Sequence, residues 1–311
     1  MKKVLITGSN GFVGQNLISS LSNKFDLYGL DRHQTRNLPK SNYYIGDLGD
    51  LNLLKKVFEE IKPDVLIHLA AIVHKNNADT SEKNYNFINF ECSKQLFDLC
   101  EKYRTHVIFS STIEVYGETE ERIINENSKC NPNSYYAKSK LKAEEYLKSL
   151  NLKYSILRFT PLYGKNFTLN IDKRVFLKKN KIAYYFKDGQ YSFDFCSINN
   201  VCDFIVNLID KYEKNDIYVL SDSNTMTVKE IIQMHKKNGN CKIIVKMPYY
   251  FCEYTILIIE KILTFMTKKD VFLSKRNFKK LFASKKYEDT KLKNVKFKWN
   301  IENTIYGEHY E

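Results

Sequence analysis

The sequence predicts an α/β fold in which a doubly wound parallel sheet carries a smaller C-terminal lobe. Up to Phe109, short uninterrupted apolar runs alternate with stretches whose apolar residues recur at helical spacing. A glycine-rich turn follows the first run. Apolar runs without polar alternation are typical of parallel strands, because crossover helices bury both faces of such a sheet.

The predicted elements alternate along the first part of the chain. Strands are expected at residues 4–7, 27–30, 43–45, 65–70 and 106–109, and helices at residues 12–22, 51–61 and 81–103. Beyond Phe159 the alternation becomes irregular. We therefore divide the chain into a sheet domain at 1–165 and a lobe at 166–311, with a strand near 217–220 returning to the sheet.

Residues 249–266 are mostly apolar, but Glu253, Glu260 and Lys261 interrupt them. The segment is too short and too charged for a membrane span. A helix packed within the lobe is favoured, and a helix lying at a membrane surface is the alternative.

The composition is that of a globular chain. Of the 311 residues, 43% are hydrophobic and 27% charged, which argues against a disordered or fibrous chain. The seven cysteines include no C-x-x-C pair, so neither a disulfide framework nor a metal site is expected. A reducing cytoplasm fits this cysteine usage, and the first residues read as a strand rather than as a secretory signal.

Much of the net charge of +13 is concentrated near the end of the chain, where residues 266–298 hold twelve Lys or Arg and three Asp or Glu. Such a run is typical of a solvated surface. Attraction to phosphate-bearing ligands, or to a membrane surface through residues 249–286, is the alternative. No zinc-finger spacing or aromatic RNA-binding motif accompanies the charge, so nucleic acid is not expected as a partner.

A phosphate-binding turn is predicted directly after the first strand. Gly8, Gly11 and Gly14 stand in T-G-S-N-G-F-V-G, where a pyrophosphate approaches the backbone and a helix N-terminus supplies amide donors. Asp31 ends the next strand, where a carboxylate accepts hydrogen bonds from ribose hydroxyls. Its charge favours NAD, whereas Arg32 beside it would accommodate NADP.

These features predict a Rossmann-type NAD(P)-binding domain. Asp47, in I-G-D-L after the third strand, is placed either to bind the adenine amino group or to act as a turn or N-cap residue. Its position alone leaves both readings open.

A catalytic pair is predicted in Y-Y-A-K-S-K. Tyr136 stands four residues before Lys140, so a helix presents both side chains on one face, whereas Tyr135 would pair with the uncharged Ser139. A tyrosine pKa of about 10 is too high for a general base at neutral pH. A nearby ammonium and the positive charge of an oxidised nicotinamide would lower it toward the working range.

The order of motifs resembles that of the extended short-chain dehydrogenase/reductases that act on nucleotide sugars. The resemblance is carried by G-S-N-G-F-V-G, G-D-L, H-L-A-A from His68, N-F-E-C-S from Asn89, S-S-T-I-E-V-Y-G from Ser110, Y-A-K-S-K and L-R-F-T-P-L-Y-G from Leu157. It implies that Thr112 is the catalytic hydroxyl and that Lys140 also holds the nicotinamide ribose. It extends the predicted cofactor site to Phe12, Val13, Leu48, Leu69, Ala70 and Ala71.

Two positions bear on which member of the family this is. Glu114, in T-I-E-V-Y-G, resembles the acid/base glutamate of the family's dehydratases and decarboxylases. Ile113 stands where dehydratases usually carry an acidic or hydroxyl side chain, and isoleucine cannot protonate a leaving hydroxyl. The segments from Lys280 and from Trp299 to Gly307 are similar to UDP-4-keto-sugar reductases of surface-polysaccharide biosynthesis.

The predicted substrate site departs from the family pattern. Phe193 stands where many relatives carry a diphosphate-binding arginine, and Ser197 replaces a histidine. A charge-assisted contact to the diphosphate is therefore missing at the expected place. The residues predicted to bind substrate are His74, Asn170, Lys173 and Arg174, of which the last two are candidate substitutes for the arginine.

The resulting expectation is an NAD(P)-dependent nucleotide-sugar 4-ketoreductase or 4-epimerase, acting as a cytoplasmic homodimer. One alternative is a 4,6-dehydratase or decarboxylase that uses Glu114. Another is a catalytically silent dinucleotide-binding partner protein.

Overall fold

The computed structural model describes residues 1–34, 38–73, 81–177, 182–212, 214–267, 278, 282 and 285–307. Its centre is a seven-stranded parallel sheet in the order β11-β7-β5-β4-β1-β2-β3. The strands are β1 (Lys3–Thr7), β2 (Asp26–Asp31), β3 (Tyr43–Ile45), β4 (Val65–His68), β5 (His106–Thr112), β7 (Tyr154–Phe159) and β11 (Asp216–Leu220). The predicted doubly wound α/β fold is confirmed.

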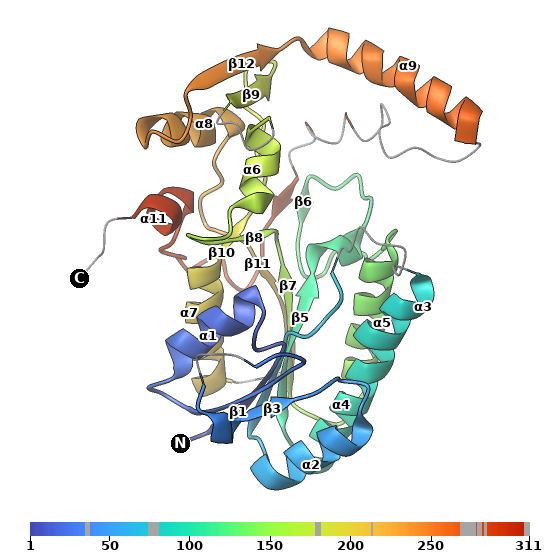
Figure 1. Ribbon diagram of the computed structural model, residues 1–311, viewed down its shortest axis with the longest axis vertical. Coiled ribbons are helices and arrows are strands. Elements are labelled where there is room, and N and C mark those ends of the chain that lie inside the picture. Colours follow the sequence, from blue (N-terminus) through green and yellow to red (C-terminus); the bar gives the residue numbers. More distant parts are fainter. Residues whose placement is uncertain are drawn as a thin grey trace.

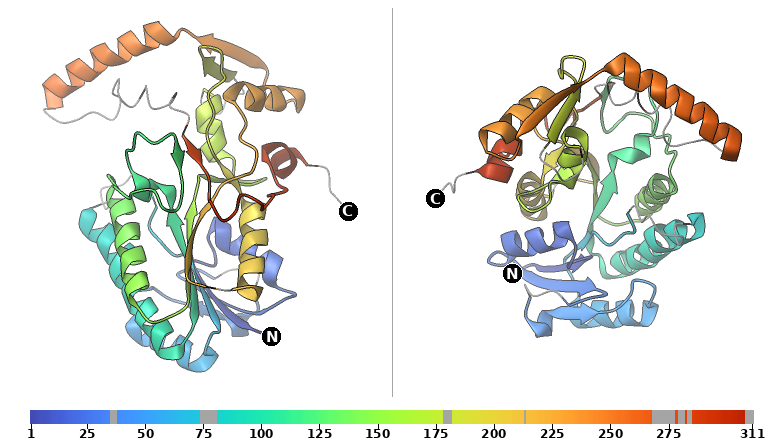
Figure 2. Two further views of the ribbon diagram at one scale, coloured as in Figure 1. Left: turned by 180° about the vertical axis from the view of Figure 1, so that it is seen from behind. Right: turned by 45° about the horizontal axis from the view of Figure 1, so that its top comes forward.

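Helices cover both faces of the sheet (Figures 1 and 2). Helices α1 (Phe12–Leu21) and α7 (Ile198–Asp210) pack on one face, and α2 (Leu51–Ile61), α4 (Cys92–Tyr103) and α5 (Tyr135–Ser149) pack on the other. Each strand of the central part contributes alternate side chains to the two cores. In β1, Val4 and Ile6 face α1 and α7, whereas Leu5 faces the second group.

Three predicted elements differ from the observed ones by more than one residue at an end or in their make-up. The expected strand at 65–70 ends at His68, and the strand expected at 106–109 continues to Thr112 through polar residues. The helix expected at 81–103 consists of α3 (Glu82–Asn86), a π-helical turn η2 (Phe87–Glu91) and α4. The apolar spacing did not predict a π-turn, because such turns are rare and occur as single turns within longer α-helices.

The lobe above the sheet has its own small core. It contains β8 (Leu162–Tyr163), α6 (Leu169–Val175), β9 (Ile182–Phe186), β10 (Cys196–Ser197), α8 (Val228–Lys237), β12 (Ile243–Met247), α9 (Tyr249–Thr267), β13 (Lys286–Tyr287) and α11 (Ile301–Tyr306). Short pairs join β8 to β10, β9 to β12 and β13 to β6 (Ile123–Ile124). Two 3-10 turns, η1 (Lys40–Asn42) and η3 (Ile113–Tyr116), complete the elements near the sheet.

The segment after α6 does not stay in the lobe. Strand β11 belongs to the main sheet, and α7 packs on that sheet (Figure 1). The division of the chain into domains at residue 165 stays a prediction. Helix α9 extends from the far end of the lobe (Figure 1). Within the described ranges, no helix is both long and apolar enough to cross a bilayer.

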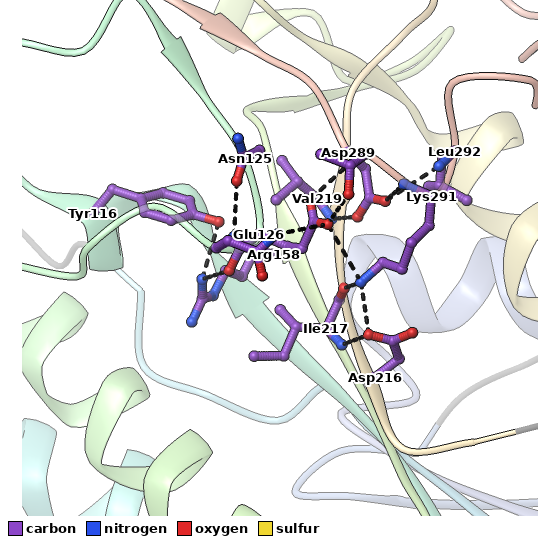
Figure 3. A network of polar contacts seen from close by, with 12 residues as sticks. Tyr116, Asn125, Glu126, Arg158, Asp216, Ile217, Val219, Asp289, Lys291 and Leu292 are labelled. Carbon is purple, nitrogen blue, oxygen red and sulfur yellow. Dashed lines mark hydrogen bonds and ion pairs between the residues drawn. The ribbon is translucent and has the colours of Figure 1, made fainter.

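The chain that follows β13 is fastened to the edge strand β11 (Figure 3). Asp289 accepts a hydrogen bond of 2.8 Å from the backbone N–H of Val219, and the Lys291 ammonium lies 2.6 Å from the Asp216 carboxylate. The backbone N–H of Thr290 donates to Glu126 at 3.0 Å. These contacts connect the C-terminal segment to the sheet on which the site is built.

Candidate active site

A cavity of about 350 Å³ opens beside the carboxyl ends of β1 and β4. These are the strands at which the chain order of the sheet reverses, the place where open α/β sheets bind ligands. Nine of the predicted cofactor residues line the cavity: Gly8, Gly11, Asp31, Arg32, Asp47, Leu48, Leu69, Ala70 and Ala71. The other five predicted cofactor residues, Phe12, Val13, Gly14, Tyr136 and Lys140, do not line it.

Each glycine of the turn is required for a different structural reason. Gly8 has φ +69°, and a Cβ there would lie 2.8 Å from the backbone nitrogen of Ala70. A Cβ on Gly14 would lie 2.5 Å from the carbonyl oxygen of Gly8, so Gly14 lets α1 pack on the turn. Gly11 is the N-cap of α1 and no described side chain caps that helix, which leaves first-turn amides for an anion. The turn therefore fits a dinucleotide pyrophosphate.

The two predicted acidic residues are held by backbone donors. Asp31 accepts a hydrogen bond of 3.0 Å from the N–H of Asn10, which ties the glycine turn to the end of β2. Asp47 accepts one of 2.8 Å from the N–H of Gly49, so it closes a turn and lines the cavity as well. Both carboxylates can accept further donors, because an ionised carboxylate has about four acceptor sites.

Helix α5 distinguishes the two tyrosines. Its N-cap Ser134 accepts from the N–H of Ala137 at 3.1 Å and fixes the start of the helix. Tyr136 and Lys140 are 9% and 2% exposed, whereas Tyr135 is 47% exposed. Tyr136 and Lys140 are therefore buried on the face of α5 that packs on the sheet.

Thr112 ends β5 beside Tyr136 and is hydrogen-bonded to it. Its Oγ1 also accepts from the N–H of Glu114 at 3.2 Å. The Glu114 carboxylate in turn accepts a hydrogen bond of 3.3 Å from Ser134. The structure thus brings together all four residues predicted as catalytic, with Glu114 on the turn η3 and Ile113 beside it.

Burial shifts the pKa values of both members of the pair toward their uncharged forms. Burial raises the pKa of Tyr136 above its usual value, the Glu114 charge adds to the rise, and the Thr112 hydrogen bond opposes it. Burial lowers the pKa of Lys140 to about 7, and the Glu144 charge opposes this fall. The predicted lowering of the tyrosine pKa requires the charges of both Lys140 and an oxidised nicotinamide, and it stays a prediction.

A second cavity of about 660 Å³ lies between the sheet and the lobe. Ile113 and Pro161, which follow β5 and β7, line it from the sheet side, and Arg174, Phe193 and Lys285 line it from the lobe. The remaining lining residues are Gly117, Glu118, Thr119, Glu120, Ser192, Asp194 and Tyr287.

Arg174 is the predicted substrate residue that lines this cavity. Its guanidinium carbon lies 4.9 Å from the ring centre of Phe193 and 5.2 Å from that of Phe195. Burial lowers the pKa of Arg174. Asn170 is occupied differently, because its amide donates to the carbonyl of Leu162 at 2.9 Å.

One of the other predicted substrate residues, Lys173, is not part of the lining of this cavity. It is on α6, and burial and the charge of Arg174 lower its pKa. His74 falls outside the described residues. Ser197, which replaces the family histidine, is buried and hydrogen-bonded to Thr304 at 2.8 Å, so it has a packing role.

The sequence prediction missed two groups of buried polar residues around Tyr136 and Lys140. The first group contains Asn89 and His68. Asn89, in the π-turn, binds both backbone groups of Ile72 and donates to Ser139 at 3.1 Å, and Ser139 donates to the carbonyl of Tyr136. His68 bridges Thr7 and another buried serine, Ser93. His68 begins the motif H-L-A-A and Asn89 begins N-F-E-C-S, so a sequence signal was present, although no role was predicted for either residue.

The second missed group is centred on Glu144, which lies one helical turn after Lys140 on the buried face of α5. Glu144 is fully buried, and Arg158 on β7 binds both of its carboxylate oxygens, at 3.1 and 2.6 Å. Ser111 donates to the same carboxylate. Within the described residues, no cluster of three His, Cys, Asp or Glu side chains could hold a metal ion.

Known proteins share this architecture. The family model described as "NAD dependent epimerase/dehydratase family" matches residues 4–221. A putative UDP-glucose 4-epimerase of Methanocaldococcus jannaschii is 30% identical over 254 residues, which are 75% of this chain and 81% of that protein. A GDP-6-deoxy-D-talose 4-dehydrogenase of Aggregatibacter actinomycetemcomitans is 28% identical and covers 75% of this chain and 78% of its own.

The fold is also that of a solved epimerase. The structure of the UDP-Glc/GlcNAc 4-epimerase from Campylobacter jejuni superimposes with a TM-score of 0.75 at 20% identity, covering 99% of this chain and 98% of that one. The family description names NAD as the cofactor, in agreement with the prediction from Asp31. The chain therefore belongs to the NAD-dependent epimerase/dehydratase family of nucleotide-sugar enzymes, within the extended short-chain dehydrogenase/reductases.

Proposed function

We propose that this enzyme transfers hydride at C4 of a nucleotide-linked sugar, as a 4-ketoreductase or a 4-epimerase. The observation that carries the proposal is the buried group of Tyr136, Lys140 and Thr112 at the carboxyl end of β5, on the same edge of the sheet as a glycine turn that fits a pyrophosphate. NAD, when bound, supplies or accepts the hydride. The C4 position is supported by the names of the epimerase and 4-dehydrogenase relatives.

The side chains have distinct roles in this proposal. The amides around Gly11 bind the pyrophosphate, and Asp31 binds the adenosine ribose. Tyr136 exchanges the proton of the sugar oxygen, and Thr112 orients the same oxygen, because its hydroxyl is within hydrogen-bonding distance of the phenol. Lys140 holds the nicotinamide ribose and provides the positive charge that stabilises a phenolate.

Arg174 is proposed to bind the diphosphate of the substrate. It is a half-buried cation that lines the larger cavity, and among the described residues no carboxylate forms an ion pair with it. A buried charge without a counter-ion is costly, and a diphosphate would compensate it bidentately. Because the guanidinium lies against Phe193, it supplies from α6 the charge that relatives carry at position 193.

A dehydratase that uses Glu114 is the second candidate. The observation in its favour is that the Glu114 charge acts on Tyr136, so the carboxylate lies near the reacting phenol. Ile113 lines the larger cavity at the place where a second acid would be needed, which favours the reductase or epimerase. A catalytically silent binding protein is disfavoured by the assembled Tyr136, Lys140 and Thr112.

The test is product analysis by mass spectrometry after incubation with NDP-sugars and their 4-keto derivatives. Net oxidation of NADH with a 4-keto sugar supports the reductase, and interconversion without net cofactor change supports the epimerase. Loss of water from the sugar would identify a dehydratase. A protein that neither binds NAD(H) nor changes any sugar would overturn the proposal.

The setting of the reaction is also a proposal. We expect a cytoplasmic homodimer that supplies sugars for surface polysaccharides. On α9, Tyr250, Phe251 and Tyr254 are exposed, so the alternative of association with a membrane surface is open to measurement. Sedimentation with anionic vesicles, which is weakened by salt if the basic residues contribute, distinguishes the two.

A further inference from the structure

We propose that Glu144 is a positioning residue of the active site, whose buried carboxylate holds Lys140 as an ammonium, while Arg158 and Ser111 hold that carboxylate in place. The inference rests on the proposed function for the role of Lys140. Its test below reads the lysine itself and needs no substrate.

The first support is the spacing along α5. Tyr136, Lys140 and Glu144 follow each other at intervals of four residues and are all buried. Residues four apart on a helix are neighbours on one face. The carboxylate therefore lies one turn from the ammonium, on the side away from the phenol.

The second support is the surroundings of Lys140. Its ammonium lies 4.1 Å from the ring centre of Phe109, and the negative charge of Glu144 favours its protonated form. His68 is neutral, since burial and the Lys140 charge lower its pKa to about 3. The elements packed around the ammonium carry these buried or half-buried titratable and charged groups near it: His68 on β4, Tyr85 on α3, Glu114 and Tyr116 on η3, Tyr136 and Glu144 on α5, and Arg158 on β7.

The third support is the way the carboxylate is fixed. Arg158 binds both oxygens, and its second amino group donates to the Tyr116 hydroxyl at 2.9 Å. Ser111 donates from the strand position directly before Thr112. The carboxylate thus joins α5 to the ends of β5 and β7, so that one group sets both the charge and the place of the pair.

The opposing effects of burial and of the Glu144 charge matter because the pKa of Lys140 lies near physiological pH. Burial lowers its pKa to about 7, with Glu144 opposing the fall. A neutral lysine would stabilise a phenolate far less than an ammonium does. Replacing the carboxylate by an amide would therefore shift the lysine toward its neutral form at physiological pH.

The experiment titrates Lys140 in protein labelled with ¹³C at the lysine ε-carbons, with the resonance assigned by its absence in Lys140→Met. We expect the Lys140 midpoint to fall by about one pH unit or more in Glu144→Gln. The matched control is Glu145→Gln, which removes the same charge from the exposed side of the same helix and should leave the midpoint in place.

Glu144→Gln leaves Arg158 buried without its partner, which threatens folding. The double variant Glu144→Gln, Arg158→Gln leaves no unpaired charge, and the lost guanidinium charge offsets only part of the lost carboxylate charge, because the guanidinium lies on the far side of that carboxylate. Its midpoint should also fall. A folded single or double variant with the wild-type midpoint would overturn the inference, whatever sugar the enzyme proves to use.

Discussion

The guanidinium of Arg174 lies against the ring of Phe193, although one residue comes from α6 and the other from the loop before β10. Arg174→Met should raise the Kd for UDP about tenfold or more, because a hydrogen bond to a charged group contributes about 1.5–3 kcal/mol. Calorimetric titration with UDP measures this. Lys173→Met, which alters the neighbouring cation away from the cavity, should change the Kd much less. Equal losses in both variants would refute a specific diphosphate contact.

Tyr136→Phe should lower turnover by roughly 10²–10⁴, since it removes the group that exchanges the substrate proton. Binding of NAD should survive, because the glycine turn is untouched. The matched variant Tyr135→Phe alters an exposed ring on the same helix and should retain activity. Steady-state rates and fluorescence titration of NADH measure the two properties separately. Full activity of Tyr136→Phe would exclude the proposed proton transfer.

Asp31→Ala should weaken NAD binding about tenfold and improve the relative affinity for NADP. The carboxylate is the proposed acceptor for the ribose hydroxyls, and its removal leaves Arg32 to face a 2′-phosphate. Direct binding titrations with both dinucleotides give the ratio. Asp210→Ala, at the C-terminal end of α7 and 57% exposed, serves as the control. An unchanged NAD/NADP ratio in Asp31→Ala would show that another residue selects the cofactor.

Acid should destabilise the protein through its buried histidines. Burial lowers the pKa of His106 to about 4, and the charges of Lys153 and Lys2 add to the fall. Because the unfolded histidine titrates near 6.5, the unfolded chain binds more protons below that pH. The free energy of unfolding therefore falls as pH drops from 6.5 toward 4, by up to about 1.4 kcal/mol per pH unit for this group.

Urea unfolding at several pH values measures that slope. In His106→Gln the slope over this window should be smaller by about the contribution of one group. His33→Gln, at an exposed position, should leave it as in the wild type. A variant slope equal to that of the wild type would mean that other groups cause the acid sensitivity.

Local chemistry predicted much of the fold because its signals lie within single elements. The buried strands are visible in the sequence as apolar runs, and the turn at Gly8 is visible from its glycines. The end of β5 was missed because Ser110 to Thr112 are polar, yet hydrogen bonds allow them to be partly or fully buried there. The choice of Tyr136 over Tyr135 succeeded because helix geometry alone decides which side chain faces the sheet.

Relationships between distant segments were beyond the same reasoning. Arg174 and Phe193 meet only because the lobe folds back on itself, and Glu144 meets Arg158 only because α5 packs against β7. The effect of burial on the Tyr136 pKa was beyond the sequence for a related reason. Charge spacing is visible along a helix, whereas the loss of water around a side chain depends on the whole packed structure.

The contact of Asp289 with Val219 bears on how the chain is made. The outermost strand β11 offers unpaired backbone groups on its free side, and such an edge invites association with other chains. Asp289 occupies one of those donors, and it leaves the ribosome well after the strand it protects. Until Asp289 has been synthesised, the nascent chain can form the sheet, but the edge strand β11 is left unprotected. Chains cut short before this residue should therefore aggregate even though every part of the catalytic group is already present.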